Sequence, residues 1–322
     1  MTVSQDFILQ NLTNVIEKTD FPLGKKIYQG KVRDTYEING KRVLITTDRQ
    51  SAFDRILASI PFKGQVLNRI SAFWFGKTKD IIENHLIAVP DANVSVVKKA
   101  TVLPIEMVVR GYITGTTSTS AWVNYNKGVR DFCGVRLPEG LKKNQKFEHP
   151  IITPTTKTEA HDEKISPKEI VERGIMTEDD WDFVADKALR LFQRGSEISA
   201  KNGFILVDTK YEFGKDSEGN IILIDEIHTP DSSRYWKVST YEERFSKGEE
   251  PETFDKEFLR LWFVEHCDPY NDKVLPDAPQ DLVVKLSEKY MQAFETITGE
   301  EFVPEMGGVT RIEENLKKYF EE

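Results

Sequence analysis

Alternating apolar and polar positions over residues 25–62 predict short β-strands early in the chain. The segments "KKIYQGKVRDTYEI" and "GKRVLITTD" flank Asn39-Gly40, a pair that is typical of a two-residue β-hairpin. Apolar residues then recur at helical spacing in "GQVLNRISAFWFGKT", and strand patterns return in "NVSVVKKATVLPIEMVVRGYITG". The first part of the chain is therefore expected to form a β-rich lobe with one or two helices.

Longer helical patterns mark the middle and the end of the chain. Residues 177–203 predict a helix that Thr177 caps and Gly203 follows. The strand pattern "FILVDTKYEF", the turn "GKDSEGN" and the buried-strand pattern "IILI" come next. "QDLVVKLSEKYMQAFETITG" and "TRIEENLKKYFEE" predict closing helices, and residues 133–168 predict the longest loop.

A row of charged residues is expected on one face of the hairpin that these strands form. Side chains alternate along a strand, so "FILVDTKYEF" places Asp208, Lys210 and Glu212 in one row. With the turn centred in "GKDSEGN", Lys210 lies opposite Asp225, whereas a register shifted by one residue moves Asp225 to the other face. This row is either a solvated charged surface or a Mg²⁺ site, because Mg²⁺ favours carboxylate oxygens and substrate phosphates.

Three other segments are candidate anion sites. In "TPDSSR", Ser233 and Arg234 offer a hydroxyl and a guanidinium fork just beyond a strand. In "VVRGYITGTTSTSAW", Arg110 precedes a hydroxyl-rich run that is either a phosphate loop or a solvated loop. Gly30 in "YQGKVRDTYE" belongs to a plain β-turn or to a tight hairpin that approaches phosphate, and its surroundings lack the Walker A spacing.

Composition narrows the class of protein. The chain has 322 residues, of which 39% are hydrophobic and 30% charged, and no apolar run approaches the roughly 20 residues of a membrane helix. A net charge of −9 disfavours general nucleic-acid binding. The N-terminus lacks the start of a signal peptide, and the two cysteines are expected to be reduced thiols, so we expect a cytoplasmic protein without membrane partners.

Six segments, taken in order, resemble one known family. They are "GKVRDTYE", "TTDRQSAFD", "RGYITGTTSTSAW", "LPEGLKKNQKFEHPIITPTTKTEAHDEKIS", "GFILVDTKYEFG" and "DEIHTPDSSRYW". Together they are similar to the phosphoribosylaminoimidazole-succinocarboxamide synthase (SAICAR synthetase) family. The resemblance implies an α+β fold of two lobes with ATP between them, distantly like protein kinases and ATP-grasp enzymes. It divides the chain into a β-rich lobe (1–105), a catalytic lobe (106–255) and a helical segment (256–322) packed on the second lobe.

The resemblance also implies the ATP contacts. Lys31 meets the phosphates, with Gly30 and Arg33 beside it, and the segment "IEMVVR" passes the adenine with backbone groups of Glu106 and Val108. A second lysine, Lys157, reaches the nucleotide, and the acids that handle Mg²⁺ and ATP are Glu212 and Asp225.

The implied ribonucleotide substrate is a carboxyaminoimidazole ribonucleotide (CAIR), which these enzymes join to L-aspartate. Arg110 and Arg234, with Ser233, match contacts to its 5′-phosphate region. The groups that match its base and ribose contacts are Asp162, Asp208 and Lys210. Either Thr116 or Ser120 supplies a family hydroxyl, and substrate or aspartate contacts are implied for Arg49 and Ser51.

The implied reaction splits ATP to ADP and phosphate and passes through an acyl phosphate, with Lys210 and Asp208 at the reacting centre. Asp208 is the candidate base for the amine of aspartate. An inositol phosphate kinase is the alternative enzyme, since Asp208-Thr209-Lys210 forms the Asp-x-Lys of those kinases. A nucleotide-binding regulatory protein that has lost catalysis is the alternative outside enzymes. The sequence indicates no oligomeric state.

Overall fold

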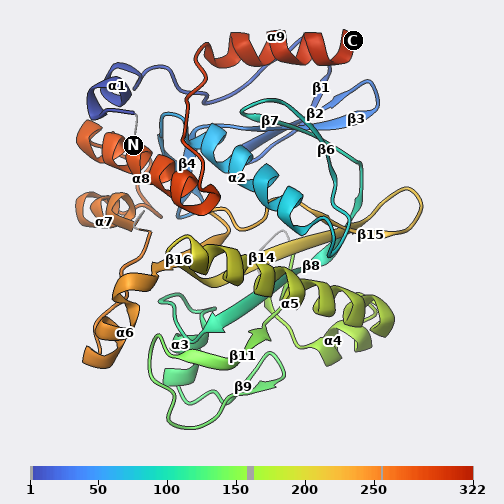
Figure 1. Ribbon diagram of the computed structural model, residues 1–322, viewed down its shortest axis with the longest axis vertical. Coiled ribbons are helices and arrows are strands. Elements are labelled where there is room, and N and C mark those ends of the chain that lie inside the picture. The colour runs from blue at the N-terminus through green and yellow to red at the C-terminus, as the bar shows by residue number, and fades with distance from the viewer. Residues whose placement is uncertain (1–2, 158–162, 255–256, 322) are drawn as a thin grey trace. The chain divides into compact units, whose positions relative to one another are not determined.

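The computed structural model describes residues 3–157, 163–254 and 257–321. Two compact units emerge from its backbone contacts. The first unit comprises residues 1–73, 86–99 and 254–322, and the second comprises residues 74–85 and 100–253. Both units mix helices with sheets, as expected for an α+β protein (Figure 1).

An antiparallel sheet of five strands forms the centre of the first unit, in the order β1-β2-β3-β7-β6. Its strands are β1 (Lys25–Gln29), β2 (Arg33–Ile38), β3 (Lys41–Thr46), β6 (Leu86–Asp91) and β7 (Val94–Val97). The predicted hairpin turn is confirmed: Asn39 and Gly40 both take positive φ, 47° and 76°, between the paired residues Ile38 and Lys41. A separate hairpin joins β4 (Arg49–Ala52) to β5 (Arg55–Ser59).

Helices from both ends of the chain belong to this first unit. They are α1 (Gln5–Gln10), the start of α2 (Lys63–Thr78), α7 (Glu257–His266), α8 (Gln280–Thr298) and α9 (Gly308–Glu321). Ile312 and Leu316 of α9 join the buried core of the five-stranded sheet, across which α9 lies (Figure 1). The Ser287 hydroxyl of α8 donates to the Pro61 carbonyl at 2.7 Å.

The predicted placement of residues 256–322 therefore needs correction. The closing helices are present as predicted, but they pack within the first unit rather than on the second lobe. The physical reason is the apolar stripe of α9, which completes the core of the N-terminal sheet. Periodicity predicts such a stripe without identifying the sheet that it covers.

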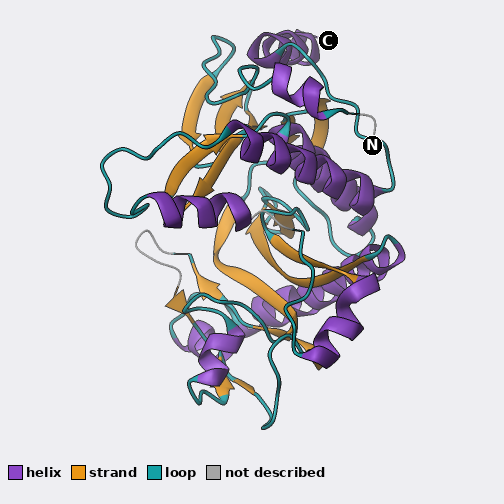
Figure 2. Ribbon diagram, turned by 90° about the vertical axis from the view of Figure 1, so that its left-hand side faces the viewer, coloured by secondary structure: helices purple, strands orange, loops and turns teal. Residues whose placement is uncertain are grey.

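A sheet of seven strands dominates the second unit, with helices beside it (Figure 2). Its strands are β8 (Thr101–Tyr112), β11 (Lys146–Ile152), β12 (Thr155–Thr156), β13 (Glu163–Lys164), β14 (Phe204–Lys215), β15 (Ile221–Ile224) and β16 (Ser233–Lys237). The short strands β9 (Asp131–Phe132) and β10 (Val135–Arg136) form a hairpin of their own. The helices of this unit are α3 (Ala121–Asn126), α4 (Pro167–Glu172), α5 (Glu178–Lys201) and α6 (Val238–Lys247).

Helix α5 confirms the predicted helix over 177–203. The Thr177 hydroxyl accepts a hydrogen bond from the Asp180 N–H at 3.1 Å, and Gly203 follows with φ of 87°. The predicted loop over 133–168 is wrong in part of its described residues, because β11 and β12 pair with β8. β12 and β13 contain two residues each, which is too short for a periodic pattern to show.

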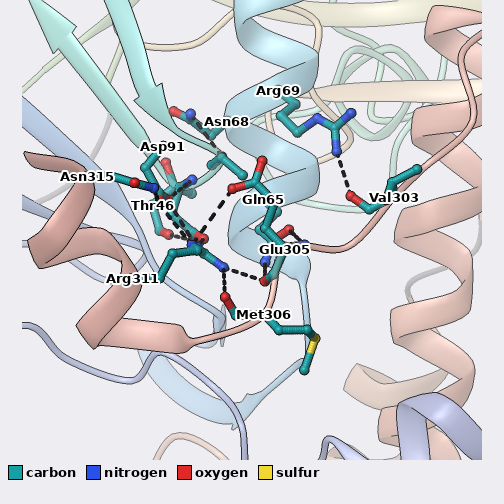
Figure 3. Close-up of polar contacts among 12 residues, drawn as sticks. Thr46, Gln65, Asn68, Arg69, Asp91, Val303, Glu305, Met306, Arg311 and Asn315 are labelled. Carbon is teal, nitrogen blue, oxygen red and sulfur yellow. Dashed lines mark hydrogen bonds and ion pairs between the residues drawn. The ribbon is translucent and has the colours of Figure 1, made fainter. Parts of the chain in front are cut away.

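A polar clamp holds the C-terminal segment against the first sheet (Figure 3). Arg311 of α9 donates Nε and Nη2 to the buried Asp91 carboxylate at 2.8 and 3.0 Å, and Nη2 to Asn93 Oδ1 at 2.6 Å. Asn315 adds a bond to the same carboxylate at 2.7 Å. The Asp91 side chain is fully buried, so this fork supplies most of its charge compensation.

Replacing Arg311 by Ala is expected to destabilise the protein by about 3 kcal/mol, because it leaves the buried Asp91 carboxylate without its cation. The measurement is the free energy of unfolding in urea. Lys317→Ala on the same helix is the control: Lys317 pairs with Glu313 at the surface, and its loss should change stability by less than about 0.5 kcal/mol. Equal effects of the two substitutions would contradict the role of the clamp.

Candidate active site

A row of charged side chains lies on one face of β14, where the sequence predicts it. Asp208 stands directly opposite Arg110 of β8 on one side and Arg234 of β16 on the other. Glu212, further along β14, stands directly opposite Glu106 of β8. Residues paired in this way point to the same face of a sheet. The face is therefore cationic near one end of the row and acidic near the other.

At the cationic end, one carboxylate lies between two guanidinium groups. Asp208 Oδ2 is 3.6 Å from Arg110 Nη1 and 3.3 Å from Arg234 Nη1. Burial lowers the pKa of Arg110, and the Asp208 carboxylate opposes this shift. Arg110 also donates Nε to the Thr153 hydroxyl at 2.8 Å, whereas Arg234 keeps 41% of its side chain exposed. Arg234 is therefore the arginine that a ligand can reach.

The loop after β8 approaches this end through a glycine. Gly115 has φ of 103°, and a Cβ there would lie 3.0 Å from Arg234 Nη1 and 2.4 Å from the Ser120 Cβ. Ser120 is buried and donates to the Thr117 carbonyl at 2.7 Å, while Thr116 is exposed. Of the two candidate hydroxyls, Ser120 is the one packed against the glycine that borders Arg234.

Two glutamates face each other at the acidic end. Like charges directly opposite in a ladder are destabilising. Lys210 offsets the repulsion, because its Nζ donates to Glu106 at 2.6 Å and to Glu212 at 3.0 Å. Lys157 forms a second ion pair with Glu212. Burial alone would lower the pKa of Lys210, but the surrounding carboxylates, Asp225 included, raise it above its ordinary value.

The predicted register of Asp225 is wrong by one residue. Glu212 pairs with Ile224, so a continued strand would place Asp225 opposite Tyr211, on the face away from Lys210. The strand ends at Ile224 instead, and Asp225 takes a left-handed φ of 67°. This turn of the backbone leaves its carboxylate close enough to contribute to the pKa of Lys210.

The adenine contact expected from backbone groups of Glu106 and Val108 stays a prediction, and one of these groups is already engaged within the sheet. β8 is an interior strand, with β14 on one side and β11 and β12 on the other. The Val108 carbonyl accepts from the Thr153 N–H at 2.8 Å. The sequence analysis did not predict that the Glu106 side chain takes part in this site. The one signal in the sequence was a charged residue within the apolar run "LPIEMVV".

The acidic end suits a magnesium ion that also binds phosphate. In residues 3–157, 163–254 and 257–321, no group of three or more histidine, cysteine or acidic side chains is arranged to hold a metal. Mg²⁺ commonly takes only one or two carboxylates and completes its shell with water and substrate phosphates. The oxygen donors of Glu212 and Asp225 meet that requirement.

A buried histidine anchors the loop that follows Asp225. His228 has φ of 51°, and its Nε2 lies 2.6 Å from the Tyr211 hydroxyl in a hydrogen bond. The Tyr235 hydroxyl donates to the His228 carbonyl at 2.7 Å. A Cβ on Gly195 of α5 would lie only 2.4 Å from the imidazole Cε1. The ring therefore packs against the helix at a position that only glycine can occupy without a clash.

Other predicted residues lie in the first unit. Lys31 is half-exposed and pairs with Asp54 in the β4–β5 turn, where Phe53 and Asp54 both take positive φ. Ser51 lies on β4 and is partly buried. Arg49 is buried and bonds to neighbouring carbonyls and to Asp34, so direct substrate contact, as predicted, does not fit its position.

The other predicted residues lie on β16 and around the β1–β2 turn. Ser233 is buried on β16 and donates to the Thr209 hydroxyl at 2.7 Å. Gly30 and Arg33 bound the β1–β2 turn. Asp162 lies outside the described residues.

A family model for SAICAR synthetase matches residues 26–276. The chain belongs to this family. A phosphoribosylaminoimidazole-succinocarboxamide synthase of Legionella pneumophila (strain Lens) is 62% identical over 288 residues, 89% of this chain and 92% of that protein. The resemblance drawn from the six segments is confirmed.

Solved structures of SAICAR synthetases share the fold. The SAICAR-synthase from Saccharomyces cerevisiae complexed with SAICAR has a TM-score of 0.78 and 36% identity, covering 90% of this chain and all of that one. A type-2 SAICAR synthetase in complex with ADP has a TM-score of 0.64 and 27% identity, covering 87% and 99%. The predicted α+β class is thereby confirmed.

The stability of this protein should depend on pH through His228. Burial lowers the pKa of His228 from 6.5 to about 3. The unfolded chain therefore binds a proton near pH 6.5 that the folded chain excludes until about pH 3, and stability falls as the pH falls through this window. Between pH 6.5 and 4.5, the wild type should lose about 2 kcal/mol more than His228→Gln, which keeps a hydrogen-bonding group.

Urea unfolding of both proteins at several pH values measures this difference. At pH 8, where histidine is neutral in both states, the two proteins differ only through packing and hydrogen bonding. Parallel stability profiles between pH 6.5 and 4.5 would show that His228 is not the group that titrates.

Proposed function

We propose that this chain joins CAIR to L-aspartate, splitting ATP to ADP and phosphate and forming SAICAR. The family makes the chain an ATP-dependent ligase of purine biosynthesis, and the inositol phosphate kinase alternative is not favoured. Relatives have been solved with SAICAR and with ADP, which supports a ribonucleotide and an adenine nucleotide as its ligands. The observation that carries the proposal is the charge row of β14, which offers a cationic end and an acidic end on one face.

The cationic end is proposed to bind the 5′-phosphate of CAIR. Arg234 is the partly exposed guanidinium, Arg110 shares the Asp208 carboxylate with it, and Ser120 is the nearby hydroxyl group. Ser233, which was predicted for this contact, points to the other face of the sheet, where its hydroxyl donates to Thr209. A guanidinium fork matches phosphate geometry. We assign Asp208 to the orientation of the two arginines, because its Oδ2 lies 3.6 Å from Arg110 Nη1 and 3.3 Å from Arg234 Nη1.

The acidic end is proposed to hold Mg²⁺ through Glu212 and Asp225. When bound, Mg²⁺ would neutralise charge on the phosphates of ATP. Lys157 and, in the first unit, Lys31 and Arg33 are proposed to contact these phosphates. Lys210 keeps its proton between Glu106 and Glu212, so we assign it a fixed positive charge rather than the role of a base.

The chemistry follows from the poor reactivity of a carboxylate toward an amine. A carboxylate oxygen of CAIR attacks the γ-phosphorus of ATP, ADP leaves, and an acyl phosphate forms. The amine of aspartate then attacks the acyl carbon, and phosphate leaves with that oxygen. Phosphoryl transfer of this kind needs positioning and charge neutralisation more than a protein nucleophile. The charge row supplies both through fixed arginines and lysines.

The test of this function uses CAIR with both carboxylate oxygens replaced by ¹⁸O, together with ATP, Mg²⁺ and L-aspartate. We expect one ADP per SAICAR and one ¹⁸O atom in each released phosphate, with the second label retained in the amide. The control omits L-aspartate and should form no SAICAR. Unlabelled phosphate would exclude the acyl phosphate, and ADP release that requires an inositol phosphate instead would favour the kinase.

Arg234→Ala is expected to raise the KM for CAIR roughly 30- to 150-fold, about 2–3 kcal/mol, with little change in the KM for ATP. The reason is the loss of the exposed guanidinium from the cationic end. Lys237→Ala removes a neighbouring cation of β16 that pairs with Glu252, and it should leave both constants unchanged. A larger effect of Arg234→Ala on ATP than on CAIR would move this residue to the nucleotide.

A further inference from the structure

Arg49 and Thr47 donate hydrogen bonds to the carbonyl groups of the turn between β1 and β2. Arg49 donates Nη2 to the Gly30 carbonyl at 2.8 Å and Nε to the Lys31 carbonyl at 3.2 Å. The next carbonyl, that of Val32, accepts from the Thr47 N–H at 2.9 Å and from the Thr47 hydroxyl at 2.6 Å. Three successive carbonyls of the turn are thus fixed by two residues of one neighbouring segment.

These bonds determine which way the peptide groups face. All described peptide bonds are trans, so each C=O and the N–H of the following residue point in opposite directions. Because the Gly30 and Lys31 carbonyls point at Arg49, the N–H groups of Lys31 and Val32 point away from it. Two successive N–H groups beside a half-exposed lysine suit an anion.

Arg49 itself is anchored in the core of the first unit. Its side chain is 3% exposed and forms an ion pair at 2.7 Å with Asp34, which is fully buried. Thr19 donates its N–H and its hydroxyl to the other oxygen of Asp34, at 3.0 and 2.9 Å. Arg49 also donates to the Glu17 carbonyl. A guanidinium engaged on four sides is a rigid support, and it is not available to a substrate.

We propose that Arg49 is a positioning residue for ATP. It holds the Gly30–Arg33 turn in the conformation that presents the Lys31 and Val32 N–H groups, and through them it sets the affinity for the phosphates. The inference rests on the proposed function, which assigns Lys31 and Arg33 to those phosphates. Arg49 acts through the turn and touches none of the three substrates.

The choice of arginine is part of the proposal. The planar fork of a guanidinium reaches two adjacent carbonyls and the Asp34 carboxylate at fixed angles. A lysine at this position keeps the charge that Asp34 needs, but its single ammonium group cannot hold both carbonyls in the same geometry. Arg49→Lys therefore separates the support of the turn from the neutralisation of the buried carboxylate.

The experiment compares Arg49→Lys with the wild type in steady-state kinetics and in calorimetric binding of ADP. We expect the KM for ATP and the Kd for ADP to rise at least about tenfold, while the KM values for CAIR and L-aspartate change by less than about twofold. Thr19→Val is the matched control. It perturbs the same buried network through Asp34 and Tyr36 without touching the turn, so it should lower Tm and leave the affinity for ADP unchanged.

The measurements distinguish a failure of the role proposed for Arg49 from a failure of the proposed function. Unchanged ADP affinity in a folded Arg49→Lys protein would overturn the inference, as would an equal rise of all three KM values. If the wild type binds no ADP, the proposed function fails instead. Should Arg49→Lys not fold, Thr47→Val removes only the hydroxyl bond to Val32, and a rise of about threefold in the Kd for ADP is expected.

Discussion

The repulsion between Glu106 and Glu212 is the constraint on which the second sheet depends. The two carboxylates lie directly opposite each other on interior strands, both are largely buried, and both point to the same face of the sheet. Lys210 is the cation between them. Because β14 also pairs with β15 and β16, the register that brings these three groups together also fixes Asp208 between its arginines. One strand thereby sets the separation between the cationic and the acidic ends.

The buried ion pairs of this strand contribute little to the stability of the fold. Buried ion pairs gain little net stability, since the desolvation of the charges offsets their attraction. Lys157 and Lys210 hold the acidic end together through their contacts with Glu106 and Glu212.

Local patterns predicted much of this molecule, and long-range pairing explains the rest. The hairpin at Asn39-Gly40, helix α5 with its Thr177 cap and the row Asp208–Lys210–Glu212 all follow from the order of residues along single segments. The side chain of Glu106 and the buried role of Arg49 do not. Each depends on which strand or turn lies beside it, and a period of two residues carries no information about the neighbour. The error at Asp225 arises in the turn between Lys215 and Ile221, whose odd number of residues shifts the pairing by one position from the predicted register.

The contact between Gly195 and His228 links a helix to a loop that lies 33 positions further along the chain. A glycine within a helix lowers its stability by roughly 1 kcal/mol relative to alanine, so its presence in α5 calls for a compensating benefit. The benefit is close packing: with glycine at position 195, the loop from Asp225 to Arg234 lies nearer to the helix than a side chain at that position would allow. These two positions form an interlocking pair. Among relatives, a larger residue in the helix should appear only where a smaller one replaces the imidazole, so the two sites are expected to covary.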